Sequence, residues 1–91
     1  MTDEQDRARL EAAQALARNL AAVRRFRGLT QREVAAYLGL HPGSMANWEA
    51  KTPKGGPTLL QGAQLAELYG VSLDALVGRV PLELTTGKGG G

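Results

Sequence analysis

The chain has 91 residues, a net charge of +2 and no cysteine. This length holds one small domain and leaves no room for a second, catalytic domain. Without cysteine there are no disulfides, no thiolate metal site and no cysteine nucleophile, which fits a reducing compartment. No apolar run approaches the ~20 residues that a membrane-spanning helix needs, so we expect a cytoplasmic protein with no membrane partner.

Positive charge is concentrated in the middle of the chain. Residues 15–56 contain seven arginines and lysines against two acidic residues, a net of +5, whereas residues 1–14 carry −2 and residues 57–91 carry −1. A basic cluster alone is often only a solvated face. It indicates nucleic acid when it coincides with a motif that binds nucleic acid.

The first predicted element is a long helix from about Asp3 to Arg27. Its apolar residues recur at spacings of three and four, the period of one helix face: Leu10, Ala13, Ala17, Leu20 and Val23. Residues 1–14 are a separate extension whose apolar content is mostly alanine, so they form either a frayed arm or a coiled contact with a second copy. Gly28 is placed to end the helix in a left-handed conformation.

A second helix is predicted after Thr30, which forms a capping box with Glu33. Val34 and Leu38 fall about one turn apart, and Gly39 ends the helix.

A third helix begins at Pro42, a residue that suits the first position of a helix. Met45 and Trp48 share one face, and the helix must end near Ala50 or Lys51, because the prolines and glycines of residues 53–57 cannot continue it. Two short helices joined by a tight turn are a helix-turn-helix. In this motif the second helix can lie in a DNA major groove while the first crosses the backbone.

Two more helices complete the predicted domain. Thr58 caps the fourth, which contains Gly62 and ends at Gly70, and Ser72 caps the fifth. In the fifth helix Leu73, Leu76 and Val77 are expected to face inward. The sequence therefore predicts an all-α, compact five-helix domain over residues 15–78, with one core formed by Leu20, Val34, Leu38, Met45, Trp48, Leu65, Leu68 and Leu76.

The C-terminal tail, residues 79–91, follows a different pattern. Val80, Leu82 and Leu84 alternate with Pro81 and Glu83, the period of an extended edge segment. Such a segment packs on the helices, pairs with a second chain or stays unstructured, and the pattern does not choose among these. The glycine-rich end is expected to be disordered.

The ordered spacing of these fragments resembles the Cro/C1-type helix-turn-helix family (XRE, lambda repressor-like) over about residues 16–78. The resemblance implies a compact five-helix domain that binds two-fold symmetric double-stranded DNA as a dimer and regulates transcription. The fragments that carry it are Arg24, Gly28-Leu29-Thr30-Gln31, Glu33-Val34-Ala35, Leu38-Gly39-Leu40, Ser44-Met45, Asn47-Trp48-Glu49, Pro57, Leu59, Leu65-Ala66, Gly70-Val71-Ser72-Leu73-Asp74 and Leu76.

Roles for individual residues follow from the resemblance. Gln31 matches a position that touches a phosphate and often a base, and the outward face of the third helix is the reading face. Pro42 and Gly43 depart from the polar readers of similar proteins, which leaves Ser44 and Asn47 to contact base edges and gives DNA shape a larger share. The expected DNA-binding residues are Arg24, Gln31, Arg32, His41, Pro42, Gly43, Ser44, Asn47, Lys51 and Lys54.

Two further expectations concern the ends of the third helix. Arg24 and Glu49 match a pair that ties the first helix to the end of the recognition helix in similar proteins. Lys51 and Lys54 lie in a loop longer than the usual spacing, within reach of phosphates. The lone histidine, His41, has no second ligand for a metal and is expected to cap the helix or approach a phosphate.

No catalytic constellation or cofactor motif is present, so we expect neither an enzyme nor a bound cofactor. The preferred hypothesis is a sequence-specific DNA-binding transcriptional regulator, a repressor, that dimerises weakly. The alternative is a protein-interaction module, an antitoxin or adaptor, that keeps the fold and holds a partner through its terminal segments.

Overall fold

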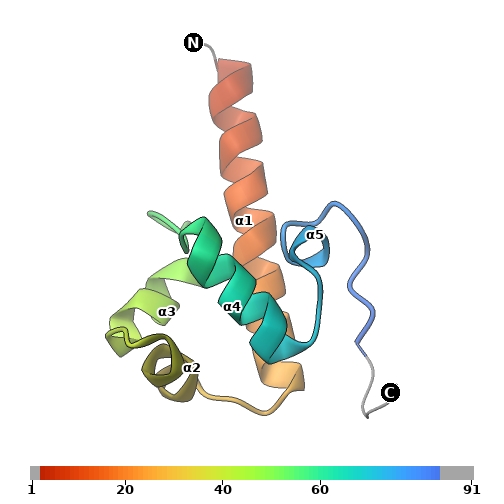
Figure 1. Cartoon of the computed structure of the whole chain (residues 1–91). Helices are drawn as coiled ribbons and strands as arrows, with labels where there is room; N and C mark the ends of the chain where they lie inside the picture. Colours follow the sequence, from red (N-terminus) through yellow and green to blue (C-terminus); the bar gives the residue numbers. More distant parts are fainter. Residues whose placement is uncertain (1–2, 85–91) are drawn as a thin grey trace.

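The computed structural model describes residues 3–84, and within them it contains five helices and no strand. Figure 1 shows α1 standing upright, with the shorter helices gathered around its C-terminal half. The predicted all-α class and the order of the five helices are confirmed. The expected disorder of the glycine-rich end lies outside the described residues. The helices are α1 (Asp3–Phe26), α2 (Gln31–Leu38), α3 (Pro42–Trp48), α4 (Leu59–Tyr69) and α5 (Leu73–Leu76).

Local capping signals set the ends of α2. The Thr30 hydroxyl accepts a hydrogen bond from the Glu33 amide at 3.0 Å, and the Glu33 carboxylate accepts one from the Thr30 amide at 2.8 Å. Gly39 ends α2 with a φ of +74°, a conformation that costs little only for glycine. Thr58 and Gln61 form an equivalent capping box at the start of α4.

One core joins α1 to the four shorter helices. Its largest fully buried side chain belongs to Tyr69 at the end of α4. Burial of such residues supplies most of the stability of a domain this small, at about 1.5–3 kcal/mol for each large apolar side chain. The buried cluster comprises Leu20, Val23, Val34, Ala35, Met45, Trp48, Leu65, Ala66, Tyr69 and Leu76.

Three details of the predicted core were wrong. Leu38 and Leu68 pack against the core but are only partly buried. Val77 is 41% exposed, because α5 is a single turn that ends at Leu76 and leaves Val77 as its C-cap. The end of the third helix was also predicted too late: α3 ends at Trp48, with Glu49 as its C-cap, rather than near Ala50 or Lys51.

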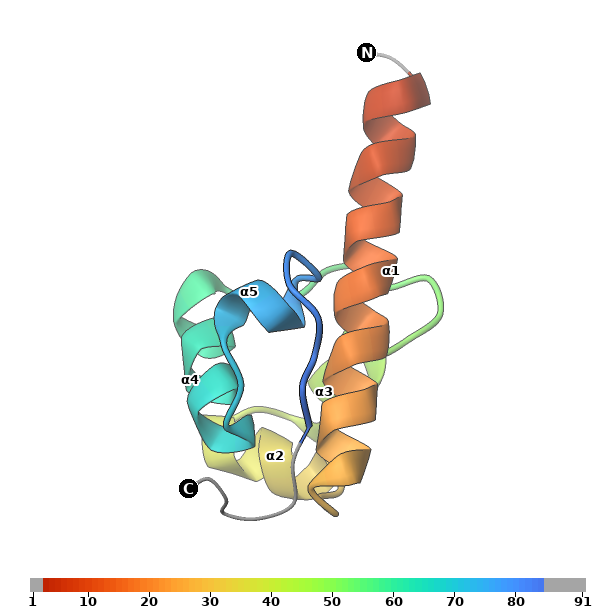
Figure 2. The same cartoon turned by 90° about the vertical axis from the view of Figure 1, so that its right-hand side faces the viewer.

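The N-terminal half of α1 extends beyond the rest of the domain. Figures 1 and 2 show this half standing clear of the other helices. Residues 3–12 are exposed although they continue the helix without a break, and burial begins at Ala13. Asp3, Glu4 and Asp6 occupy its first turn, where the helix dipole favours negative charge. The arm is therefore helical, and the side chains at its start make no contribution to the core.

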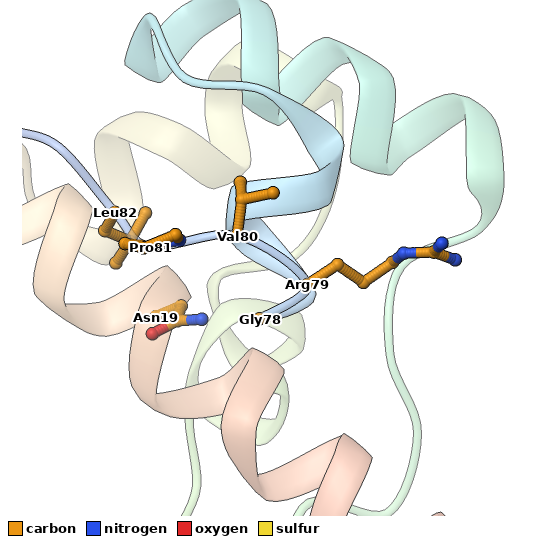
Figure 3. A pocket seen from close by; sticks show the side chains of 6 residues that line it. All are labelled: Asn19, Gly78, Arg79, Val80, Pro81 and Leu82. Carbon is orange, nitrogen blue, oxygen red and sulfur yellow. The ribbon is translucent and has the colours of Figure 1, made fainter.

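The segment after α5 lies on the helices and forms no strand. Leu82 and Leu84 are partly buried and pack against the core, so of the three possibilities for this segment the structure shows packing on the helices. Asn19 of α1 lies beside the turn that starts this segment (Figure 3). Its side-chain amide donates to the carbonyl oxygens of Ala75 at 3.2 Å and Leu76 at 3.0 Å, which satisfies two carbonyls at the end of α5.

No helix within residues 3–84 combines the length and hydropathy that crossing a membrane requires.

Candidate nucleic-acid interface

Two backbone hydrogen bonds close the C-terminal end of α2, where the chain turns toward α3. The Leu40 amide donates to the Ala35 carbonyl at 2.8 Å, and the Gly39 amide donates to the Ala36 carbonyl at 3.1 Å. Met45 and Trp48 turn the inner face of α3 into the core, with exposed fractions of 0% and 8%. Since that face is buried, the opposite face of α3 is the one left for a ligand.

The start of α3 is open to solvent. Here Nδ1 of His41 accepts a hydrogen bond from the Gly43 amide at 3.0 Å, which makes His41 the N-cap, as predicted. A Cβ added at Gly43 would lie 3.2 Å from that nitrogen, so a larger residue would crowd the cap. His41, Pro42 and Gly43 are exposed, whereas Ser44 is partly buried.

A buried ion pair connects α1 to the end of α3. Nε of Arg24 donates to Oε2 of Glu49 at 2.7 Å, Nη2 donates to Oε1 at 2.9 Å, and Nη1 donates to the Leu29 carbonyl at 2.7 Å. The exposed fractions of the two side chains are only 10% and 3%. The hydrogen bond to Glu49 raises the pKa of Arg24 above its usual value, and desolvation opposes that shift. The predicted tie between these residues is therefore confirmed.

Gln31 extends this pair to α2. Its Nε2 donates to Oε1 of Glu49 at 3.0 Å, so one carboxylate receives donors from both α1 and α2. This contact fixes the side-chain amide of Gln31 at the start of α2, where it is partly buried. A side chain held in one rotamer loses less entropy when it binds a phosphate or a base than a free one does.

Tyr69 lies close enough to the Arg24–Glu49 pair to interact electrostatically with both charges. Burial raises the pKa of its hydroxyl well above the usual value, the Glu49 carboxylate raises that pKa further, and Arg24 lowers it. The hydroxyl has no hydrogen-bond partner among the residues that the structure describes. The buried phenol therefore lies in a poorly solvated region that it shares with the ion pair, where charges interact more strongly than in water.

The loop between α3 and α4 is held by two side chains that do not belong to it. Oδ1 of Asn47 accepts a hydrogen bond from the Lys54 amide at 3.2 Å, and Nε2 of Gln14 donates to the Lys51 carbonyl at 3.2 Å. Figure 2 shows this loop passing beside α1. The two lysine side chains are exposed.

The expected DNA-binding residues fall into two groups in the structure. Those at the start of α3 and in the following loop are exposed or partly buried, and Arg32 on α2 is exposed as well. Arg24 differs, being 8% exposed with three N–H donors already engaged inside the protein. Its visible role is to hold Glu49, and its direct contact with DNA stays a prediction.

Sequence reasoning did not find the contacts of Gln14 and Asn47 with the loop. Gln14 falls in the predicted N-terminal extension, and the residue that it meets lies 37 positions away. For Asn47 the family resemblance predicts only the reading of bases. Neither contact has a local sequence signal, because both depend on how the longer loop folds back on α1 and α3.

Within residues 3–84, no three or more histidine, aspartate or glutamate side chains are grouped so that they could hold a metal ion.

Comparison with known families gives one match. A family model described as "Helix-turn-helix" covers residues 20–76, which include all of α2, α3, α4 and α5. Comparisons with curated proteins and with solved structures found no match.

Proposed function

The chain belongs to the Cro/C1-type helix-turn-helix family, whose members bind DNA, and from this premise we propose that it is a repressor that inserts α3 into the major groove. The observation that carries this proposal is the arrangement of α3. Its inner face, with Met45 and Trp48, is buried, while its N-terminal end is exposed. A helix presented end-first in this way suits insertion between the two phosphate backbones.

Charge supports the same orientation. The net charge of +5 lies between residues 15 and 56, the span that contains the C-terminal half of α1, α2, α3 and the loop after α3. DNA binding of this kind draws most of its affinity from cations placed against phosphates, with release of counterions. In the proposed complex Gln31, Arg32, Lys51 and Lys54 contact the backbone, and Arg24 acts through Glu49 and Gln31.

Few side chains remain to read bases. Pro42 and Gly43 offer no side-chain donors or acceptors, so direct reading falls to Ser44 and Asn47, with His41 beside them. We propose that recognition combines these few contacts with the shape and deformability of the site. Two copies, related by a two-fold axis on half-sites ~34 Å apart, would double the number of bases read. We propose that the two copies associate only weakly in the absence of DNA.

Two substitutions separate anchoring from reading. Lys51→Ala should weaken binding to all duplexes about equally and flatten the dependence of log K on log salt by about 0.9, the contribution of one phosphate. Asn47→Ala should cost ~1–3 kcal/mol on the preferred site and much less on random DNA. Fluorescence anisotropy measures the affinity of each variant for both duplexes over a range of salt concentrations.

The contact between Asn47 and the loop calls for a control. Because Oδ1 of Asn47 accepts from the Lys54 amide, Asn47→Ala also releases the loop. Lys54→Ala shows what the loss of the Lys54 charge alone does to affinity and salt dependence. If Asn47→Ala weakens both duplexes equally and resembles Lys54→Ala, the asparagine anchors the loop, and reading rests on Ser44 and DNA shape.

The alternative function, a protein-interaction module, draws on the exposed N-terminal half of α1 and on the poor reading capacity of Pro42 and Gly43. A gel shift against random duplex DNA at low and moderate salt distinguishes the two. A salt-sensitive complex supports the regulator. If no complex forms at low salt, the interaction module is the better account.

A further inference from the structure

A cleft of about 370 Å³ lies between α1 and the end of α3, and of the residues that line it Lys51 alone belongs to the expected DNA-binding set. One wall is formed by Gln14 and Arg18 of α1, and the other by Glu49, Ala50 and Lys51. The residues of the α1 wall are four positions apart and therefore share one helix face, about one turn from each other. The cleft thus places a cation of the long helix opposite a cation of the loop.

The position of Lys51 in this cleft is set by α1 itself. The Gln14 side chain donates to the Lys51 carbonyl at 3.2 Å, which ties the loop backbone to the same helix face that carries Arg18. The Asn47 contact at Lys54 adds a second side-chain bond to the loop backbone. The backbone of Lys51 is therefore held beside the helix face that carries Arg18, and both residues line the same cleft.

The charges around the cleft leave it positive. Arg18 and Lys51 are exposed, and neither forms a salt bridge with a carboxylate of residues 3–84. Glu49 is the only acidic residue in the walls, but its side chain is 3% exposed and already accepts hydrogen bonds from Arg24 and Gln31. A cleft with two exposed cations beside a neutralised carboxylate suits an anion with several oxygen acceptors.

We propose that Arg18 and Lys51 bind one backbone phosphate of the DNA between them, so that α1 forms part of the DNA-binding surface. The inference rests on the proposed function, because the cleft adjoins the loop that follows the recognition helix. Arg18 extends the DNA-binding surface beyond the helix-turn-helix onto α1. The family match covers α1 only from residue 20 onward, so Arg18 lies outside it. We assign the phosphate to the DNA backbone, because a backbone phosphate would lie at a fixed position relative to α3. A single cleft that binds it can then add affinity and fix the register of the protein on the DNA.

Ethylation interference on the wild-type chain tests this, with DNA selected from a random pool. Ethylating a phosphate removes its charge, so each contacted phosphate appears as a position where the modification prevents binding. The compared variants are Arg18→Ala, Lys51→Ala, Arg18→Lys and a matched control, Arg9→Ala. Arg9 is exposed on the same helix, and its nine-residue separation from Arg18 places it about 180° around the axis.

The expected result is that Arg18→Ala and Lys51→Ala lose interference at the same single phosphate, while Arg9→Ala loses none. Arg18→Lys should keep that signal. Because the two cations share one phosphate, replacing both Arg18 and Lys51 with alanine should flatten the dependence of log K on log salt by no more than about 0.9 in slope. Loss at two different phosphates, or no loss with Arg18→Ala, overturns the shared phosphate. The shared DNA phosphate is also overturned if inorganic phosphate at 10 mM binds at the cleft while the ethylation-interference pattern on DNA stays unchanged. Failure of the wild-type chain to bind DNA instead refutes the proposed function.

Discussion

Replacing Trp48 with alanine should unfold the domain or bring it close to unfolding. The indole is 8% exposed and packs in the cluster that joins α3 to α1 and α4, so its removal leaves a large cavity. Such truncations cost about 3–5 kcal/mol, compared with a total stability of about 5–15 kcal/mol for a small domain. Thermal and urea unfolding followed by circular dichroism measure the change.

Tyr37→Ala is the matched control for that experiment. Tyr37 is an aromatic residue of the neighbouring helix α2, but 54% of it is exposed. Its truncation should change the free energy of unfolding by much less than that of Trp48. If Trp48→Ala melts like the wild type, the assignment of Trp48 to the core is wrong.

Arg24→Met should destabilise the fold by about 3–5 kcal/mol, because it leaves the Glu49 carboxylate buried without its main partner. The Glu49 side chain is 3% exposed and receives two hydrogen bonds from Arg24, so water cannot easily replace the guanidinium. The carboxylate that positions Gln31 would lose its own anchor, so the Gln31 side chain would be held less firmly. We therefore expect weaker DNA binding in addition to the lower stability.

Two further variants isolate the cause. The double substitution Arg24→Met with Glu49→Leu removes both charges and should recover much of the lost stability, because no buried charge remains. Arg79→Ala breaks the Arg79–Asp74 pair, whose side chains are 76% and 65% exposed, and should change stability by less than ~1 kcal/mol. Should the double variant be no more stable than Arg24→Met alone, the unpaired carboxylate is not the source of the cost.

The sequence predicted the parts of the fold that local chemistry controls. Thr30 with Glu33, and the glycines at residues 39 and 70, mark helix ends through contacts within a few residues, and the structure has helix ends at these places. Val34, Met45, Trp48 and Leu65 also follow a helical period that predicts their burial.

Long-range features were harder to predict. The burial of Tyr69 and the packing of Leu82 and Leu84 depend on which surfaces meet, and alternation along the chain does not determine that. The Arg24–Glu49 pair was expected only through the family resemblance, because charges 25 positions apart carry no local signal of contact. The contacts of Gln14 and Asn47 with the loop were not predicted at all, for the same reason.

The central claim, that α3 enters the major groove, is tested most directly by dimethyl sulfate protection on a site selected from a random pool. This reagent methylates guanine N7, which faces the major groove. The account predicts protection of N7 in two half-sites about 34 Å apart, and loss of that pattern when Ser44 and Asn47 are both replaced by alanine. The claim is contradicted if every guanine N7 is fully methylated although the DNA is saturated with protein in a salt-sensitive complex. The protein would then bind the DNA without placing α3 in the groove.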